Sequence, residues 1–198
     1  MKKVKQIRDR FRGFLPIVVD VETGGIECKT DALLEVAMVS LKMDEAGYFS
    51  TDLMLHEHIE PHEKLRLDPK SLAFNKIDPF HPFRFAKPEK EALESLFKEI
   101  KNLKKHYQCS HAVLVGHNAW FDLGFINEAA ERNKLKSPFH AFTSFDTATL
   151  SALVYGQTVL PKALQAAGLP YNAEEAHSAI YDAMRTAELF CKIVNNQN

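Results

Sequence analysis

The sequence is poor in cysteine, with three in 198 residues. Cys28, Cys109 and Cys191 stand far apart, so no two of them have the close spacing of a zinc site. An odd number of cysteines without a secretory signal peptide indicates reduced thiols, and we therefore expect a cytoplasmic protein. The scarcity excludes a small scaffold held together by disulfide bonds.

The chain also lacks long apolar runs and a strong net charge. No apolar run approaches the roughly 20 residues of a membrane-spanning helix, and the N-terminus lacks the apolar core of a signal peptide, so we expect no membrane partner. The formal net charge is −1, so total charge does not by itself indicate a nucleic-acid partner. Residues 1–13 are an exception and predict a basic arm, because they hold one acid, Asp9, against Lys2, Lys3, Lys5, Arg8, Arg10 and Arg12.

The composition, 45% hydrophobic and 26% charged, is ordinary and favours one globular domain over residues 1–198. Apolar segments and turn residues predict an antiparallel meander of three strands, over 15–22, 31–43 and 48–59. After the meander, helices are predicted over 68–74, 89–105, from a cap at Asn118, and over 146–154, 162–167 and 178–194. Two further strands are predicted, over 112–116 and ending at Phe145. This order favours an α/β fold, with a mixed sheet flanked by helices.

Two acids stand at the end of the first strand. Side chains alternate along a strand, so Asp20 and Glu22 point to the same face. Two neighbouring carboxylates repel each other and resist burial, and a bound divalent cation would offset that cost. An isolated D-x-E is nevertheless more often an acidic strand end that faces water.

Three residues further along the chain could join this pair. Asp122 lies in the first turn of its helix, away from the apolar stripe, where a first-turn acid is also favoured by the helix dipole. Asp182 lies about 200° around the last helix from the stripe residue Ile180, although an exposed helix acid is the commoner explanation. His177 precedes that helix and is suited to act as a general base near neutral pH, although taken alone it is more often a surface histidine.

Taken together, the four carboxylates indicate a different kind of site. Converging from a strand end and two helix starts, they could hold two divalent ions, the usual arrangement for in-line phosphodiester hydrolysis. One ion would activate water, the other would stabilise the leaving oxygen, and His177 would accept the proton of the water. The sequence therefore predicts a catalytic set of Asp20, Glu22, Asp122, His177 and Asp182, with the four acids as metal ligands.

The segments 20–22, 117–122 and 177–182 resemble, in order and spacing, the three motifs of the DEDDh exonuclease superfamily. Within it the chain is similar to the ribonuclease T family, and the similarity covers nearly the whole chain. Further matching segments are 10–14, 29–35, 73–75, 138–140, 144–148, 156–160 and 176–179. The resemblance implies a ribonuclease-H-like fold and a homodimeric 3′-to-5′ exoribonuclease that uses two Mg²⁺ ions, with Mn²⁺ as an alternative.

The resemblance also implies substrates and the residues that bind them. The substrates would be the 3′ ends of tRNA and other stable RNAs, together with single-stranded DNA. Phe74, Phe121 and Phe142 would stack on terminal bases, although each could instead be an ordinary core residue. A basic patch on one subunit would hold RNA for the active site of the other. Its candidate cations, about half of which we expect to be merely solvated, are Arg10, Arg12, Lys101, Lys104, Lys105, Lys134 and Lys136.

Two positions depart from the family pattern. The position after Gly24-Gly25 is normally aromatic but is Ile26 here, and a family acid falls at Lys70. Both would lie near the terminal base, so we expect weaker discrimination between bases. Two alternatives to the leading hypothesis stay open. One is another DEDDh exonuclease, of the oligoribonuclease or proofreading type, and the other is a non-catalytic RNA-binding module, against which the intact five-residue set argues.

Overall fold

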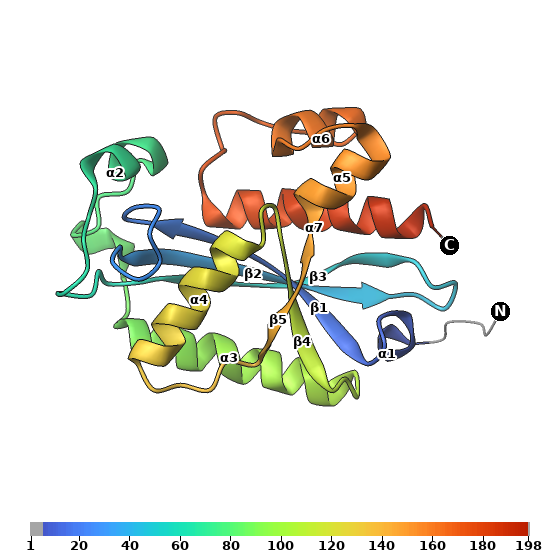
Figure 1. The fold of residues 1–198 in the computed structure, drawn as a ribbon, viewed down its shortest axis with the longest axis horizontal. Helices are drawn as coiled ribbons and strands as arrows, with labels where there is room; N and C mark the ends of the chain where they lie inside the picture. The colour runs from blue at the N-terminus through green and yellow to red at the C-terminus, as the bar shows by residue number, and fades with distance from the viewer. Residues whose placement is uncertain (1–5, 198) are drawn as a thin grey trace.

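The structure is a computed structural model that describes residues 6–197. Across these residues five strands form one mixed sheet in the order β3-β2-β1-β4-β5 (Figure 1). The strands are β1 (Phe14–Thr23), β2 (Leu33–Met43), β3 (Phe49–His58), β4 (His111–Gly116) and β5 (Phe139–Asp146).

The central strand β1 is paired on both sides. Val18 lies opposite Val39 of antiparallel β2 and opposite Val115 of parallel β4. A strand covered on both faces and both edges reads as a continuous apolar run, and Leu15 to Val19 are buried accordingly. The predicted meander is confirmed, because β1, β2 and β3 pair antiparallel in sequence order.

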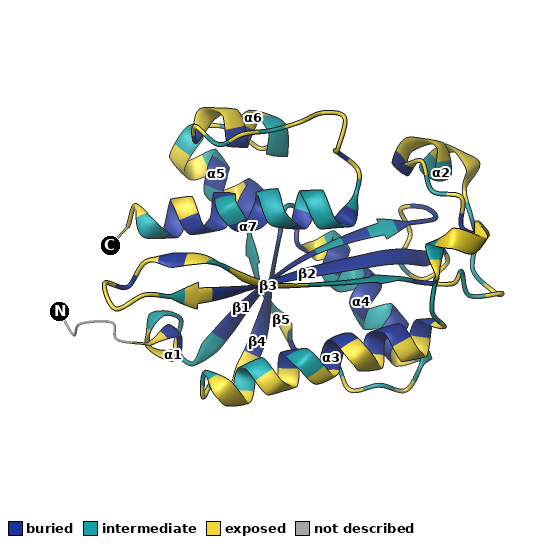
Figure 2. Cartoon of the chain, turned by 180° about the vertical axis from the view of Figure 1, so that it is seen from behind, coloured by how far each residue is buried: buried dark blue, intermediate teal, exposed yellow. Residues whose placement is uncertain are grey.

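The helices cover both faces of the sheet. Figure 1 shows α7 with α5 and α6 on one side, and α3 with α4 on the other. In Figure 2 the strands between them are largely buried, while the outer faces of the helices are exposed. The helical segments are α1 (Ile7–Arg10), α2 (Pro69–Asn75), the 3-10 turn η1 (Pro82–Arg84), α3 (Glu89–His106), α4 (Trp120–Arg132), α5 (Thr147–Tyr155), α6 (Leu160–Ala166) and α7 (Ala179–Asn195). None of the helices in residues 6–197 is both long and apolar enough to cross a membrane.

The described part of the basic arm packs against the core. Ile7 is buried on α1, and the ring of Phe11 lies 5.0 Å from that of Phe145 and 5.7 Å from that of Phe49. The cations Lys2, Lys3 and Lys5 lie outside the described residues. The Phe11 ring also lies 6.2 Å from that of Phe190 on α7, so the arm packs against both the sheet and the last helix.

The expected cap of α4 is wrong. Asn118 lies one residue too early, with a left-handed φ of 67°, and Ala119 is the N-cap residue without a side-chain hydrogen bond among the described residues. Asp146 compensates, because its Oδ1 accepts from the backbone N–H groups of Asn118 and Ala119 while the same carboxylate caps α5. One carboxylate thus fixes the starts of two helices beside the site.

Candidate active site

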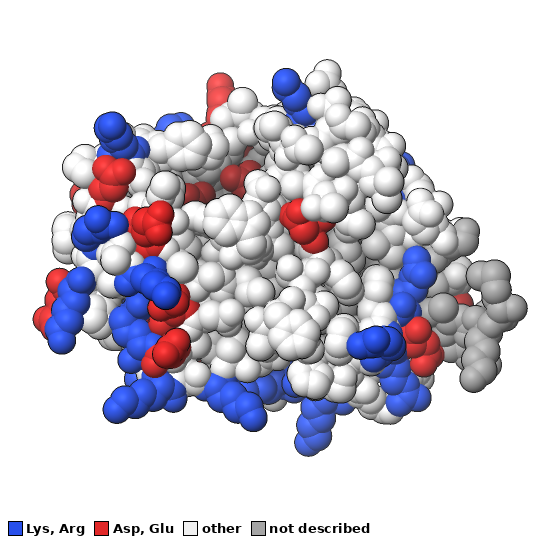
Figure 3. All heavy atoms as spheres, viewed as in Figure 1, with Lys and Arg blue, Asp and Glu red and all other residues white. Residues whose placement is uncertain are grey.

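One pocket at the carboxyl end of β1 contains all five residues of the predicted catalytic set. Asp20 and Glu22 come from β1, Asp122 from the first turn of α4, Asp182 from the first turn of α7, and His177 from the loop before it. The surface view shows acidic atoms recessed in a hollow, while lysines and arginines gather along the lower edge (Figure 3). The structure therefore brings together residues that are up to 162 positions apart, from Asp20 to Asp182.

The donor set fits a hard divalent cation. Carboxylate oxygens of Asp20, Glu22 and Asp182 lie within 4.8 Å of one another. Burial, followed by the charges of Asp122 and Asp182, raises the pKa of Asp20 well above its usual value. Burial and the charges of Asp182 and Glu35 raise the pKa of Glu22 to about 8. Such mutual repulsion is relieved when a cation is bound between the acids.

Asp122 approaches the same pocket from α4 and is 4% exposed. Its Oδ1 accepts a hydrogen bond of 3.1 Å from the backbone N–H of Val21, which lies between the two β1 acids. Burial raises the pKa of Asp122 to about 8 despite that bond. Gly116 makes room for this carboxylate, because a Cβ at that position would lie 2.9 Å from Asp122 Oδ2.

His177 lies on an exposed loop and is held at its backbone. Its N–H donates to Asp182 Oδ2 at 3.0 Å, and its φ of 64° is left-handed. The predicted position of His177 in the loop before the helix is thus observed, since α7 begins at Ala179. The exposed imidazole can reach solvent and a substrate while its backbone remains fixed to a candidate metal ligand.

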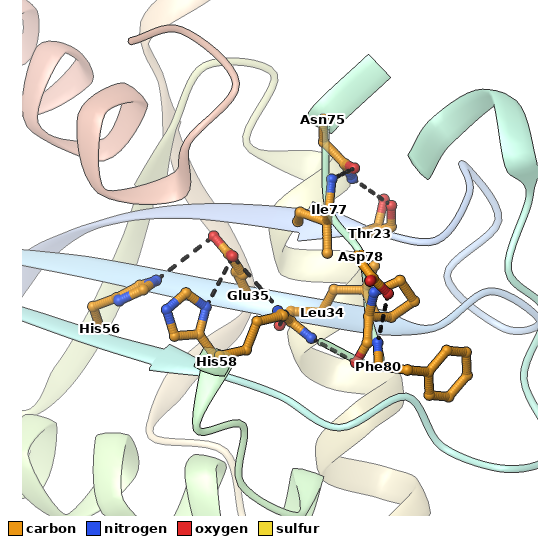
Figure 4. Close-up of polar contacts among 11 residues, drawn as sticks. Thr23, Leu34, Glu35, His56, His58, Asn75, Ile77, Asp78 and Phe80 are labelled. Atoms are coloured by element: carbon orange, nitrogen blue, oxygen red, sulfur yellow. Dashed lines mark hydrogen bonds and ion pairs between the residues drawn. The ribbon is translucent and has the colours of Figure 1, made fainter. Parts of the chain in front are cut away.

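The apolar wall of the pocket comes from three elements. Phe74 on α2, Phe121 on α4 and Ile26 after β1 all line it, as does Lys70. Buried Asn75 fixes α2 against β1, because its Nδ2 donates to Thr23 O at 3.0 Å (Figure 4). The two departures from the family pattern therefore lie in the pocket with the acids.

Trp120 and His117, to which no role was assigned from the sequence, also line the pocket. Trp120 is 70% exposed at the rim, and only its position beside Phe121 in the second motif could have signalled it. His117 is tied by its Nε2 to Thr158 O at 2.8 Å and by its Nδ1 to Thr147 Oγ1 at 3.0 Å. Burial lowers the pKa of His117, and because both ring nitrogens are held by hydrogen bonds the side chain is suited to a structural role.

Phe142 does not join the pocket. It lies on β5, 85% exposed, in a separate groove with Lys101, Lys104 and Lys136. The remaining predicted cations lie outside this groove. Arg10 is half-buried against the Phe11 ring, Arg12 is exposed over the Phe14 ring, and Lys105 and Lys134 are exposed. The molecule thus carries an acidic pocket and a separate groove of lysines and an aromatic ring.

Comparison with known proteins identifies close relatives. An exonuclease family represented by ribonuclease T matches residues 17–190. Ribonuclease T of Salmonella typhimurium is 56% identical over 188 residues, which cover 94% of this chain and 87% of the relative. Ribonuclease T of a Shewanella species (strain W3-18-1) is 54% identical over 191 residues, covering 96% and 86%.

Solved structures share the fold at low sequence identity. Escherichia coli exonuclease I in complex with a dT13 oligonucleotide aligns with a TM-score of 0.70 at 15% identity, over 92% of this chain and 41% of that one. A 3′-exonuclease that recognises the histone mRNA stem-loop aligns with a TM-score of 0.72 at 16% identity, over 91% and 81%. The fold is therefore the ribonuclease-H-like fold of DEDDh exonucleases, as expected from the sequence.

Proposed function

Because the chain belongs to the ribonuclease T family and is a DEDDh 3′-to-5′ exoribonuclease, we propose that it trims the 3′ ends of tRNA and other stable RNAs, and single-stranded DNA, with Mg²⁺. The observation that carries this proposal is the convergence of Asp20, Glu22, Asp122 and Asp182 beside an exposed histidine. Reduced thiols favour the cytoplasm as the place of action.

The residues of this pocket have separate tasks. Asp20, Glu22 and Asp182 would hold one divalent ion, and Asp20 with Asp122 a second. Bound at such a cluster, Mg²⁺ lowers the pKa of a water molecule and stabilises the negative charge of the departing oxygen. His177 would accept the proton of the attacking water, and its loop gives the ring access to that water.

The apolar wall would select single-stranded ends. The rings of Phe74 and Phe121 would stack on unpaired bases, which a duplex does not present. The ring centroids of Phe74 and His177 lie 4.1 Å apart. A nucleotide whose base stacks on Phe74 would therefore have its phosphate close to His177, the proposed general base. This arrangement is consistent with the removal of nucleotides from an unpaired end.

A homodimer would explain the separate groove. Phe142 lines it with Lys101, Lys104 and Lys136, so it does not stack beside Phe74 and Phe121 within one chain. In a dimer the groove of one subunit could hold RNA whose 3′ end enters the pocket of the other. Lysines bind the phosphate backbone and the exposed ring stacks on a base.

The test is a time course with purified protein, Mg²⁺ and a 5′-labelled duplex RNA that carries a short 3′ overhang. We expect the overhang to shorten one nucleotide at a time and the reaction to slow at the duplex. A matched blunt duplex controls for the need of an unpaired end. Cleavage inside the strand, or preferential degradation of very short oligonucleotides only, would contradict the proposal.

A further inference from the structure

A second group of metal-binding side chains lies outside the catalytic pocket. Glu35 is on β2, and His56 and His58 are on β3, with Glu35 directly opposite His58 and Ala37 opposite His56. Directly paired residues share a face of the sheet, so the three side chains meet on one face (Figure 4). On its other side Glu35 pairs with Glu22, which places this group one strand away from the catalytic acids.

The separations between the polar atoms suit a shared ion. His58 Nδ1 lies 2.9 Å from Glu35 Oε1, and His56 Nε2 lies 3.6 Å from Glu35 Oε2. One ligand atom from each residue lies within 4.8 Å of the others. Ligands about 2.0–2.2 Å from a tetrahedral Zn²⁺ are roughly 3.3–3.6 Å apart, so small adjustments would close the site.

The group is shielded from water and incompletely satisfied. The side chains of Glu35, His56 and His58 are 11%, 17% and 35% exposed. His56 Nε2 is buried and finds no hydrogen-bond partner among the described residues. An orphaned ring nitrogen directed at a carboxylate is the atom that a metal ion would satisfy.

Among residues 6–197, Arg84 is the cation that approaches the group. Arg84 Nη2 lies 3.9 Å from Glu35 Oε1, but its hydrogen bonds go to backbone carbonyls, from Nη2 to Leu34 O at 2.9 Å and from Nη1 to Pro79 O at 3.0 Å. A ligating carboxylate commonly has such an outer partner, which orients it. The guanidinium thus stands beside Oε1, which also shares a hydrogen bond of 2.9 Å with His58 Nδ1, and leaves Oε2 with the unsatisfied ring nitrogen of His56 for an ion.

We propose that Glu35, His56 and His58 form a second metal site, selective for a divalent transition ion such as Zn²⁺. Imidazole ligands suit zinc, whereas the all-carboxylate catalytic cluster suits Mg²⁺. An ion at this site would tie the edge strand β3 to β2 and hold Glu35 beside Glu22. The alternative is a metal-free ion-pair network of Glu35 with the histidines and Arg84.

Co²⁺ distinguishes the two, because its visible absorption reports nitrogen ligands and a low coordination number. The full protein is titrated with Co²⁺ in a large excess of Mg²⁺, which occupies the carboxylate cluster. His56→Gln and His58→Gln keep polar side chains but remove a ligand, and His106→Gln on exposed α3 is the matched control. We expect one Co²⁺ to bind the wild type and His106→Gln with a visible band.

Loss of a residue that only hydrogen-bonds to a metal ligand typically lowers metal affinity about 10–100-fold. Loss of a ligand itself should cost more, so the Co²⁺ affinity of each ligand variant should fall by at least about 100-fold. Both variants should retain Mg²⁺-dependent nuclease activity, which also shows that they fold. A wild type without the band, or a band that survives in both ligand variants, would overturn the proposal.

Thermal stability gives an independent readout. Zn²⁺ at about a hundred times its dissociation constant should raise the Tm by roughly 5–10 °C in the presence of Mg²⁺. The rise should persist in His106→Gln and vanish in His58→Gln. An equal rise in all three proteins would place the zinc elsewhere and overturn the assignment.

Discussion

The backbone N–H of His177 donates to Asp182 Oδ2 at 3.0 Å, so the candidate general base is fixed by a candidate metal ligand. The backbone of residue 177 is left-handed where it makes this bond, with a φ of 64°. It uses the backbone of His177 and one lone pair of the carboxylate, so the imidazole, which packs against the ring of Phe74, takes no part in it. A shift of the Asp182 carboxylate would therefore also move the loop that carries His177.

Replacement of His177 tests its role as the base. His177→Asn should lower the rate by about 10²–10⁴-fold, because no group then accepts the proton, while asparagine tolerates the left-handed backbone. His177→Ala removes the same group but adds backbone strain, and comparing the two separates chemistry from loop geometry. Mg²⁺ affinity by calorimetry should survive in His177→Asn. Its collapse would make His177 a ligand or a structural residue.

Removal of one central acid should separate activity from stability. Asp20→Asn is expected to abolish nearly all turnover, because this residue would contact both ions. Without metal the same change relieves repulsion with Asp122 and Asp182, so the Tm at pH 8 should rise by about 2–5 °C. Activity above a tenth of wild type in Mg²⁺ would contradict the assignment.

The raised pKa values predict how metal-free stability depends on pH. Folding raises the pKa of Glu22 from its usual 4.5 to about 8, so between these values the folded state binds more protons than the unfolded state. Stability in EDTA should therefore fall as pH rises from about 4.5 to 8, because the unfolded chain releases the proton first. Mg²⁺ should flatten this slope in thermal unfolding, and an identical slope with and without Mg²⁺ would contradict a metal site at these acids.

The proposed dimer makes a prediction about trans complementation. Lys104→Glu with Lys136→Glu should weaken RNA binding and reduce the salt slope by roughly 1.4, for two lost phosphate contacts. Lys162→Glu on exposed α6 is the charge control. Co-expression of the groove variant with Asp20→Asn should restore activity above either alone, because one pocket and one groove then remain intact across the dimer. A fully active monomer in analytical ultracentrifugation would refute the arrangement.

The sheet and the acidic pocket were predictable because they depend on local periodicity. Two-residue alternation put Asp20 and Glu22 on one face, and helical spacing freed Asp182 from the core stripe. The carboxylate that caps the start of α4 was not predictable, because it belongs to Asp146, which is 28 residues away from Asn118 in the sequence. The site at Glu35 was missed for the same reason: its ligands meet only through the register between β2 and β3.

A substitution at position 26 tests whether this residue contacts the terminal base of the substrate. Ile26 is 74% exposed and lines the pocket, as does Phe74, which is 63% exposed. Asp31 holds the turn that carries Ile26, because its Oδ2 accepts a hydrogen bond of 3.0 Å from Glu27 N. The same oxygen lies so close to Gly25 that any Cβ at that position would clash with it. A larger side chain at residue 26 can therefore extend into the pocket without moving the backbone.

Isoleucine offers a base an apolar contact but no π face. Stacking on an aromatic ring is worth roughly 1–3 kcal/mol per base, so part of that energy is absent here. Ile26→Phe should tighten binding of a short single strand by about 1 kcal/mol, or roughly fivefold, in the catalytically inactive Asp20→Asn background. Ile26→Leu is the matched control, because it keeps the apolar volume without adding a ring. Mg²⁺ affinity of the otherwise wild-type protein should not change. If Ile26→Phe and Ile26→Leu bind alike and share one preference among terminal bases, residue 26 does not face the terminal base, and the stacking surface must be placed on Phe74, Phe121 and Trp120 instead.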